Sequence, residues 1–296
     1  MHRPTIALVL LLAVTAAFAQ GKPVAVARQV TASYAIDMAP APDGKRAVLI
    51  RVISGRQQLF VRTLADGAEQ QITFDAAEHE DPAWSPDGRH IAFVLIKADD
   101  SKVVHLIAPD GSGDEAITPA GQSVLHPSFT PDGKTILYCT DDDLRPPAKN
   151  ESSIYAIDLA SRRVTTLISG GVNTFPVMSP DGHRVAFRRI VGEMNSEVFV
   201  ADADGKNARN LTNHWSFEGW PAWSPDGRTI AYAGNRNNAG YQIFLMDPDG
   251  GNVRLLAATE GRGTAPKWSA DGKAVYFTIC RQSQEHRGCD IYSADV

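Results

Sequence analysis

The sequence predicts an all-β fold: a six-bladed β-propeller of four-stranded antiparallel blades, closed by an N-terminal strand that completes the last blade. A turn motif occurs six times, its spacing is close to 45 residues, and each interval has room for four short strands. The glycines that end the motif are Gly44, Gly88, Gly133, Gly182, Gly227 and Gly272. Their separations of 44, 45, 49, 45 and 45 residues are typical of one four-stranded blade each.

The motif itself predicts a tight hairpin turn. Its full form is an aromatic or apolar residue followed by Ser-Pro-Asp-Gly, as in residues 84–88. Proline presets φ for the first corner, aspartate bonds to the backbone just beyond, and glycine takes the left-handed conformation. The turn joins a short strand such as 82–85 to a β-rich one such as 91–94. A third strand, as in 243–247, and a fourth, ending as in 255–256, complete the blade.

The two ends of the chain predict how the ring closes. The sixth repeat stops at Val296, directly after its third strand, and residues 28–31 reproduce the fourth-strand pattern before the first repeat begins. A propeller must cover the exposed edges of its first and last blades. We therefore expect residues 28–31 to complete the last blade, within one propeller domain over residues 20–296.

Residues 1–19 are typical of a signal peptide, with a short basic start, an apolar run and a small-x-small end at Ala19. No later stretch reaches the roughly 18 apolar residues that a membrane span needs. The net charge of -5 and the lack of a basic block argue against a nucleic-acid partner. We expect a soluble monomer that is periplasmic or secreted.

Export makes a disulfide chemically possible. Cys280 and Cys289 stand at the two ends of a hairpin in the last repeat, where antiparallel pairing can bring them opposite each other. We predict a disulfide between them. Cys139 stands in an apolar strand and is predicted to be a buried, inert thiol.

The six Pro-Asp-Gly repeats and the stretch at residues 235–247 resemble the WD-like repeats of the TolB-like propeller family. The resemblance covers essentially the whole chain after residue 19 and implies the same six-bladed ring. The TolB protein itself carries a further α/β domain before the propeller, and residues 20–37 are too few to form one. The resemblance therefore extends to the propeller part alone.

One aligned position predicts the groups around the channel mouth. It directly precedes an inner-strand proline in five repeats, and its six occupants are Asp37, Asp81, His126, Phe175, Trp220 and Ala265. Loops that join blades surround one mouth of the channel, where function usually lies. Two carboxylates and an imidazole could hold a divalent ion, but a polar lining filled with water accounts for the same residues. We predict no metal and no cofactor.

Residues 214–220 form the densest aromatic cluster in the chain. Aromatic side chains in exposed loops are typical binding hot spots. The predicted contacts to a partner are His126, Trp215, Phe217, Glu218 and Trp220. For one of the two tryptophans, packing between blades is the alternative.

Signatures of hydrolases, metalloproteases, redox proteins and nucleotide-binding proteins are absent from the sequence. The acidic insertion at residues 141–150 is interpreted as a solvated loop. The leading hypothesis is an exported, non-enzymatic scaffold that grips a protein or peptide in the cell envelope. The alternative is a carbohydrate-active lyase or hydrolase with Asp37, Asp81 and His126 in the channel, an analogy based on fold alone.

Overall fold

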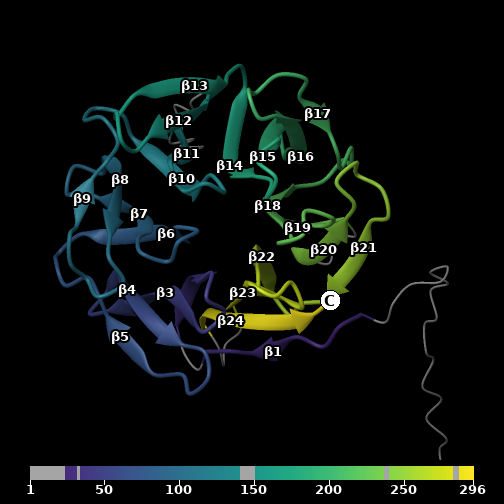
Figure 1. The fold of residues 1–296 in the computed structure, drawn as a ribbon. Helices are drawn as coiled ribbons and strands as arrows, with labels where there is room; N and C mark the ends of the chain where they lie inside the picture. The colour runs from purple at the N-terminus through teal and green to yellow at the C-terminus, as the bar shows by residue number, and fades with distance from the viewer. Residues whose placement is uncertain (1–23, 32–33, 141–150, 237–239, 283–286) are drawn as a thin grey trace, which may run out of the picture.

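The computed structural model describes residues 24–31, 34–140, 151–236, 240–282 and 287–296. Over these residues, six four-stranded antiparallel sheets surround a central axis as blades (Figure 1). The predicted fold class is confirmed. The expected signal peptide, residues 1–19, and the acidic insertion, residues 141–150, lie outside the described residues. The described residues contain no helix that is long and apolar enough to cross a membrane.

In five blades, the four strands follow one another in chain order from the channel outward (Figure 1). In the last blade, the first three strands do so, and the outermost strand comes from the N-terminus. The first three blades are β2 (Ala35–Pro40), β3 (Arg46–Ile53), β4 (Arg56–Thr63) and β5 (Glu69–Gln71); β6 (Glu78–Trp84), β7 (Ile91–Ile96), β8 (Lys102–Ile107) and β9 (Glu115–Ala116); and β10 (Val124–Phe129), β11 (Thr135–Thr140), β12 (Ile154–Asp158) and β13 (Val164–Ile168). The last three are β14 (Val172–Met178), β15 (Arg184–Gly192), β16 (Asn195–Asp202) and β17 (Arg209–Asn210); β18 (Glu218–Trp223), β19 (Ile230–Gly234), β20 (Gln242–Met246) and β21 (Arg254–Ala257); and β22 (Arg262–Trp268), β23 (Ala274–Gln282), β24 (Arg287–Asp295) and β1 (Arg28–Gln29).

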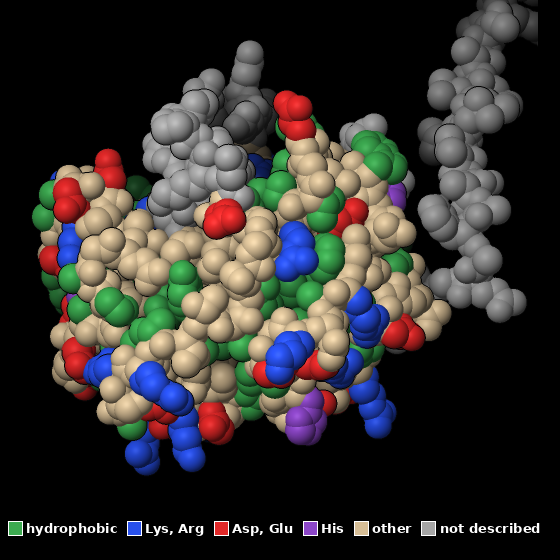
Figure 2. All heavy atoms as spheres, turned by 90° about the horizontal axis from the view of Figure 1, so that it is seen from above, with side chains coloured by type: hydrophobic (Ala, Val, Ile, Leu, Met, Phe, Trp, Pro, Cys, Tyr) green, Lys and Arg blue, Asp and Glu red, His purple; other side chains and the backbone are tan. Residues whose placement is uncertain are grey.

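This strand order divides the connections between two faces. The Pro-Asp-Gly turns and the turns between third and fourth strands lie on one side, which we call the turn face. The hairpins between second and third strands and the connections between blades lie on the other, the loop face. In the edge-on view of Figure 2, many charged side chains project from the lower side, the turn face, where each motif glycine is followed by Lys, Arg or His.

The buried apolar residues fill the spaces between neighbouring blades. Val48 and Ile50 of β3, for example, share a cluster with Ile91 and Phe93 of β7. The motif's aromatic residue joins the same layer, since Trp84 is 8% exposed and belongs to this cluster. Each blade therefore depends on its neighbours for its core, as in other repeat proteins.

The turn motif is held by side-chain hydrogen bonds that involve its serine as well as its aspartate. Ser85 Oγ donates to Asp87 Oδ1 at 2.6 Å and accepts from the His90 N–H at 2.9 Å. Asp87 Oδ1 also accepts from the Arg89 N–H at 3.0 Å, as the sequence predicts. The hydrogen bond from Ser85 is the main reason that the pKa of Asp87 is lowered. Equivalent pairs occur at Thr130 and Asp132, Ser179 and Asp181, Ser224 and Asp226, and Ser269 and Asp271.

Most of the motif glycines also lie close to the turn of the preceding blade. A Cβ on Gly88, whose φ is +69°, would lie 3.5 Å from Pro42 Cγ, and one on Gly133 would lie 3.5 Å from Pro86 Cδ. The same contact joins the last blade to the first, but there Gly44 faces Ala270, which occupies the proline position of the sixth motif. The contact with a proline is therefore reduced to a methyl group at Gly44, and a Cβ on Gly182 would have no neighbour within 4 Å.

We predict that Ala270→Pro stabilises the protein by about 0.4 to 1 kcal/mol, because proline restricts the unfolded chain at a corner whose native backbone it fits. The Ala270 N–H donates no hydrogen bond within the described residues, so none is lost. Urea unfolding measures the change. The matched control, Pro225→Ala in the neighbouring blade, should lose a similar amount. A lower midpoint for Ala270→Pro would contradict the prediction.

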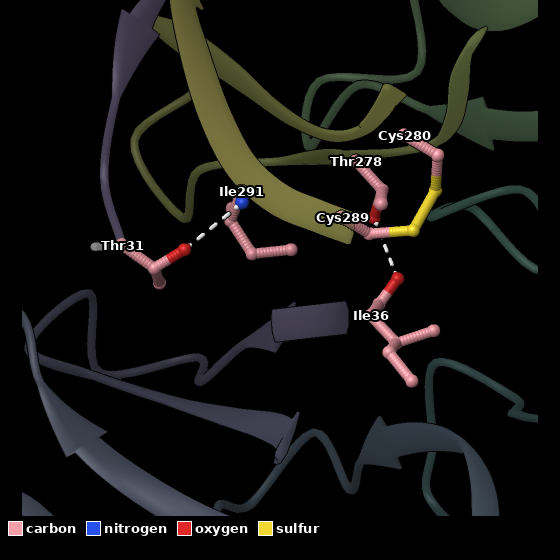
Figure 3. The surroundings of a disulfide bond; sticks show 6 residues. All are labelled: Thr31, Ile36, Thr278, Cys280, Cys289 and Ile291. Carbon is pink, nitrogen blue, oxygen red and sulfur yellow. Dashed lines mark hydrogen bonds between the residues drawn. A yellow bond between two sulfur atoms is a disulfide. The ribbon is translucent and has the colours of Figure 1, made fainter. Parts of the chain in front are cut away.

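The N-terminal strand closes the ring as predicted. β1 pairs antiparallel with β24, and Arg28 lies opposite Ser293. The Ile291 N–H donates to Thr31 Oγ1 at 3.0 Å (Figure 3), and the Ile291 carbonyl accepts from the Val30 N–H at 2.8 Å. The last blade is therefore built from both ends of the chain.

A disulfide joins the two middle strands of this closing blade, β23 and β24. Cys280 and Cys289 lie directly opposite each other on β23 and β24, and their sulfur atoms are bonded at 2.02 Å (Figure 3). Two residues earlier on β23, Thr278 Oγ1 donates to the Ile36 carbonyl of the first blade at 2.9 Å. The hairpin that the disulfide fastens is therefore also attached to the next blade.

Candidate functional site

The central channel contains a cavity of about 390 Å³ that runs from the six aligned positions to the turn face. At one end it is lined by Asp37, Asp81, His126, Phe175, Trp220 and Ala265, which we call the channel ring. Pro42, Pro86, Pro225 and Ala270 of the turns line the other end. The structure thus brings all six aligned residues into the wall of one cavity.

The ring residues belong to the inner strands themselves and not to the connections between blades. Its members are the third or fourth residue of each inner strand, and the cavity lining includes no described residue from the loop side of the ring. That these residues stand at a mouth of the channel stays a prediction.

The inner strands place the ring through a repeated β-bulge. In each blade, the register between the first two strands shifts at this position. Five ring residues have positive φ: Asp81 at 52°, His126 at 55°, Phe175 at 53°, Trp220 at 53° and Ala265 at 51°. Such angles are strained for residues other than glycine, and bulges re-aim side chains. The repeated proline after the ring residue was the available signal, because proline inside a strand marks an edge or a bulge.

Acidic groups and a histidine form one half of the ring. The His126 N–H donates to Asp81 Oδ2 at 3.1 Å, and its Nε2 lies 3.6 Å from the same oxygen. Its Nδ1 lies 3.3 Å from Sγ of Cys139, which is fully buried. Burial, and secondarily the charge of Asp81, raises the pKa of Asp37 to about 6, against the lowering effect of Lys267. No group of three His, Cys, Asp or Glu among the described residues is placed to hold a metal ion.

Aromatic rings form the opposite half. The Phe175 ring centroid lies 3.6 Å from that of His126 and 5.2 Å from that of Trp220. The Trp220 and Tyr241 rings form a T-shaped pair with centroids 5.8 Å apart, and the Arg262 guanidinium lies 4.7 Å from the Tyr241 centroid. One half of the ring is therefore acidic and the other aromatic. Ala265, which has the smallest side chain of the six, lies between Trp220 and Asp37.

Lys267 is a channel residue that the sequence reasoning missed. Two positions beyond each ring residue, the cavity wall carries Ala39, Ala83, Ser128, Val177, Ala222 and Lys267. Five of these are small or apolar, so Lys267 is the only cation in this layer. Aligning the repeats two positions further along would have revealed it.

The predicted aromatic cluster divides between two places. Trp220 lies in the channel, whereas Trp215 lies on the loop face with 62% of its surface exposed. Phe217 is half-buried and forms a parallel bridge with Ser196, at the start of β16. The inward packing considered for one tryptophan thus applies to Trp220.

Glu197 anchors the loop that carries Trp215. The buried Glu197 carboxylate accepts from the His214 N–H at 2.8 Å and from Thr212 Oγ1 at 2.5 Å. The His214 ring stacks on Trp215 with centroids 5.3 Å apart. Burial, followed by the neighbouring Glu218, raises the pKa of Glu197, although the Thr212 hydrogen bond lowers it. The exposed indole therefore stands on a loop with fixed anchor points.

The structure corrects the prediction that Glu218 contacts a partner. Its side chain is fully buried, and Arg236 Nε and Nη2 donate to its two oxygens at 2.5 and 3.2 Å. A carboxylate that is both buried and doubly paired is not available to another molecule. Glu218 instead holds Arg236 beneath the loop face.

A family model described as the TolB beta propeller domain matches residues 23–148 and 110–294. Among curated relatives, a TolB homolog of Chlorobium luteolum is 30% identical over 112 residues, which cover 37% of this chain and 25% of the relative. Three such relatives are matched over 16, 25 and 52% of their own lengths. The chain thus spans about half or less of these proteins.

Solved structures share the fold. TolB of Acinetobacter baumannii superposes with a TM-score of 0.67 at 22% identity, covering 88% of this chain and 63% of that one. An oligogalacturonate lyase of Vibrio parahaemolyticus superposes with a TM-score of 0.59 at 14% identity, covering 91 and 93%. At such identities the likeness shows the propeller and nothing about the chemistry of its channel.

Proposed function

This chain belongs to the TolB beta-propeller family, and from that premise we propose that it is an exported, non-enzymatic scaffold that holds a protein or peptide partner in the cell envelope. The observation that carries the proposal is the exposed indole of Trp215 on an anchored loop of the loop face. Tryptophan is enriched among residues that dominate binding energy. A fixed loop also loses little conformational freedom when it binds.

Other exposed apolar side chains support a contact on this face. Met194, at the tip of the β15–β16 hairpin, is 74% exposed, and Val191 in the same hairpin is 47% exposed. The bridge between Ser196 and Phe217 runs parallel, so the hairpin tip and the Trp215 loop leave it in the same direction. His126 and Trp220 lie deeper, in the channel ring, and would meet only a segment that enters the channel.

The enzyme alternative would use Asp37, Asp81 and His126 in the channel. Its support is the raised pKa of Asp37, which suits a proton donor. Since burial is the largest cause of this shift and needs no catalytic role, this observation does not favour catalysis over binding.

Trp215→Ala should weaken partner binding about 30-fold, which corresponds to about 2 kcal/mol for a hot-spot residue. Partners are captured from envelope extracts on the immobilised protein, and the dissociation constant of the purified partner is then measured. Val253→Ala is the matched control, since Val253 is an exposed apolar residue of the turn face. Equal affinity for both variants would contradict the proposal.

A further inference from the structure

Three polar groups in the channel keep unused hydrogen-bonding capacity. Asp37 Oδ1 accepts from the Met38 N–H at 2.7 Å, and Asp81 Oδ2 accepts from the His126 N–H at 3.1 Å. Within the described residues, the other oxygen of each carboxylate and the ammonium of Lys267 make no hydrogen bond or close ion pair. A ligand in the cavity can therefore both donate to the acids and accept from the lysine.

The arrangement of these charges disfavours a charged ligand. Asp81 is close enough to Asp37 to raise its pKa further, and Lys267 is close enough to oppose that shift. An anion would meet the two carboxylates, and a cation would meet the ammonium. A neutral ligand with several hydroxyl groups avoids both repulsions, because each hydroxyl donates one hydrogen bond and accepts others.

The aromatic half of the ring offers a complementary surface. Phe175 and Trp220 line the cavity beside these polar groups. A pyranose has an apolar C–H face that packs on aromatic rings. The cavity volume of about 390 Å³ lies in the range of small-molecule sites.

We propose that the channel binds a neutral sugar that enters from the turn face, with its hydroxyls on Asp37, Asp81 and Lys267 and its apolar face against Trp220. The room for it is at Ala265, the smallest member of the ring. This site does not depend on the protein-binding function proposed above, which uses the opposite face. It involves binding and no chemical reaction.

The test uses Ala265→Trp to fill that room. Phe175 and Trp220 occupy the equivalent positions with φ of 53°, and Ala265 has 51°, so the backbone already accommodates an aromatic side chain there. Titration calorimetry measures binding of glucose, galactose, mannose and N-acetylglucosamine, with galacturonate and glucosamine as charged analogues. We expect a neutral sugar to bind in the millimolar range or tighter, and Ala265→Trp to weaken it at least about tenfold with an unchanged melting temperature.

Lys267→Met provides a second variant that leaves the ring in place, and it should also weaken the neutral sugar. Trp215→Ala should leave sugar binding unchanged, which separates this site from the loop face. Failure of every neutral sugar to bind, preference for a charged analogue, or full affinity in both channel variants would overturn the proposal. Loss of partner capture in Trp215→Ala would say nothing against it.

Discussion

Deleting residues 24–31 should lower the free energy of unfolding by about 4 kcal/mol. β1 would leave the edge of β24, with the loss of its ladder and of the hydrogen bonds from Val30 and to Thr31. The Ala25 N–H also donates to the Leu256 carbonyl of the neighbouring blade at 2.8 Å. About four such bonds, each worth about 1 kcal/mol, give the estimate. Urea unfolding of a chain expressed from residue 20, with and without the deletion, measures it.

A synthetic peptide of residues 24–34 provides the control. Added to the shortened protein, it should raise the unfolding midpoint progressively as its concentration exceeds its dissociation constant, because it binds the folded state. A peptide with the same composition in scrambled order should not. Equal stability of the two chains would mean that pairing at this edge contributes nothing to the ring.

Arg236→Met should destabilise the protein by about 3 kcal/mol or more. The substitution removes both donors to Glu218, whose carboxylate is fully buried. A buried charge left without its partner typically costs about 3 to 5 kcal/mol. The guanidinium also lies 5.6 Å from the Tyr232 ring centroid, a contact that methionine partly retains through its apolar stem. Urea unfolding at neutral pH measures the loss.

The double variant Glu218→Gln, Arg236→Met separates the buried charge from the loss of packing. It should recover much of the stability, because no uncompensated charge remains in the interior. If the double variant is as unstable as Arg236→Met, packing and not the ion pair explains the effect. Full stability of Arg236→Met would show that Glu218 is reached by water.

The blade number, the turns and the closing strand could be predicted because their causes are local. Proline, aspartate and glycine act within a few residues of one another, as the hydrogen bonds around Asp87 show. The missing fourth strand at Val296 could be matched to residues 28–31 by pattern alone. The Cys280 and Cys289 pairing followed from hairpin register, and the structure forms that bond.

The site was harder to predict because its residues are placed by tertiary packing. Neither composition nor period reveals that Glu218 lies inside the blade while Trp215, three residues earlier, is exposed. The contact between His126 and Cys139 joins neighbouring strands through a bulge, which shifts the register that a regular pattern assumes. Lys267 could be recognised as a channel cation only once the structure showed that the equivalent positions of the other five blades carry uncharged side chains.

The way the last blade is built also decides how the molecule can be held. Arg28, at the start of β1, is ion-paired with Asp295, and the Val296 N–H donates to the Lys273 carbonyl in the sixth turn at 3.0 Å. The C-terminal end of the folded ring therefore lies on the turn face, opposite Trp215. A tag, tether or bead attached at Val296 would leave the indole pointing away from its support, so this capture format does not mask the surface under test.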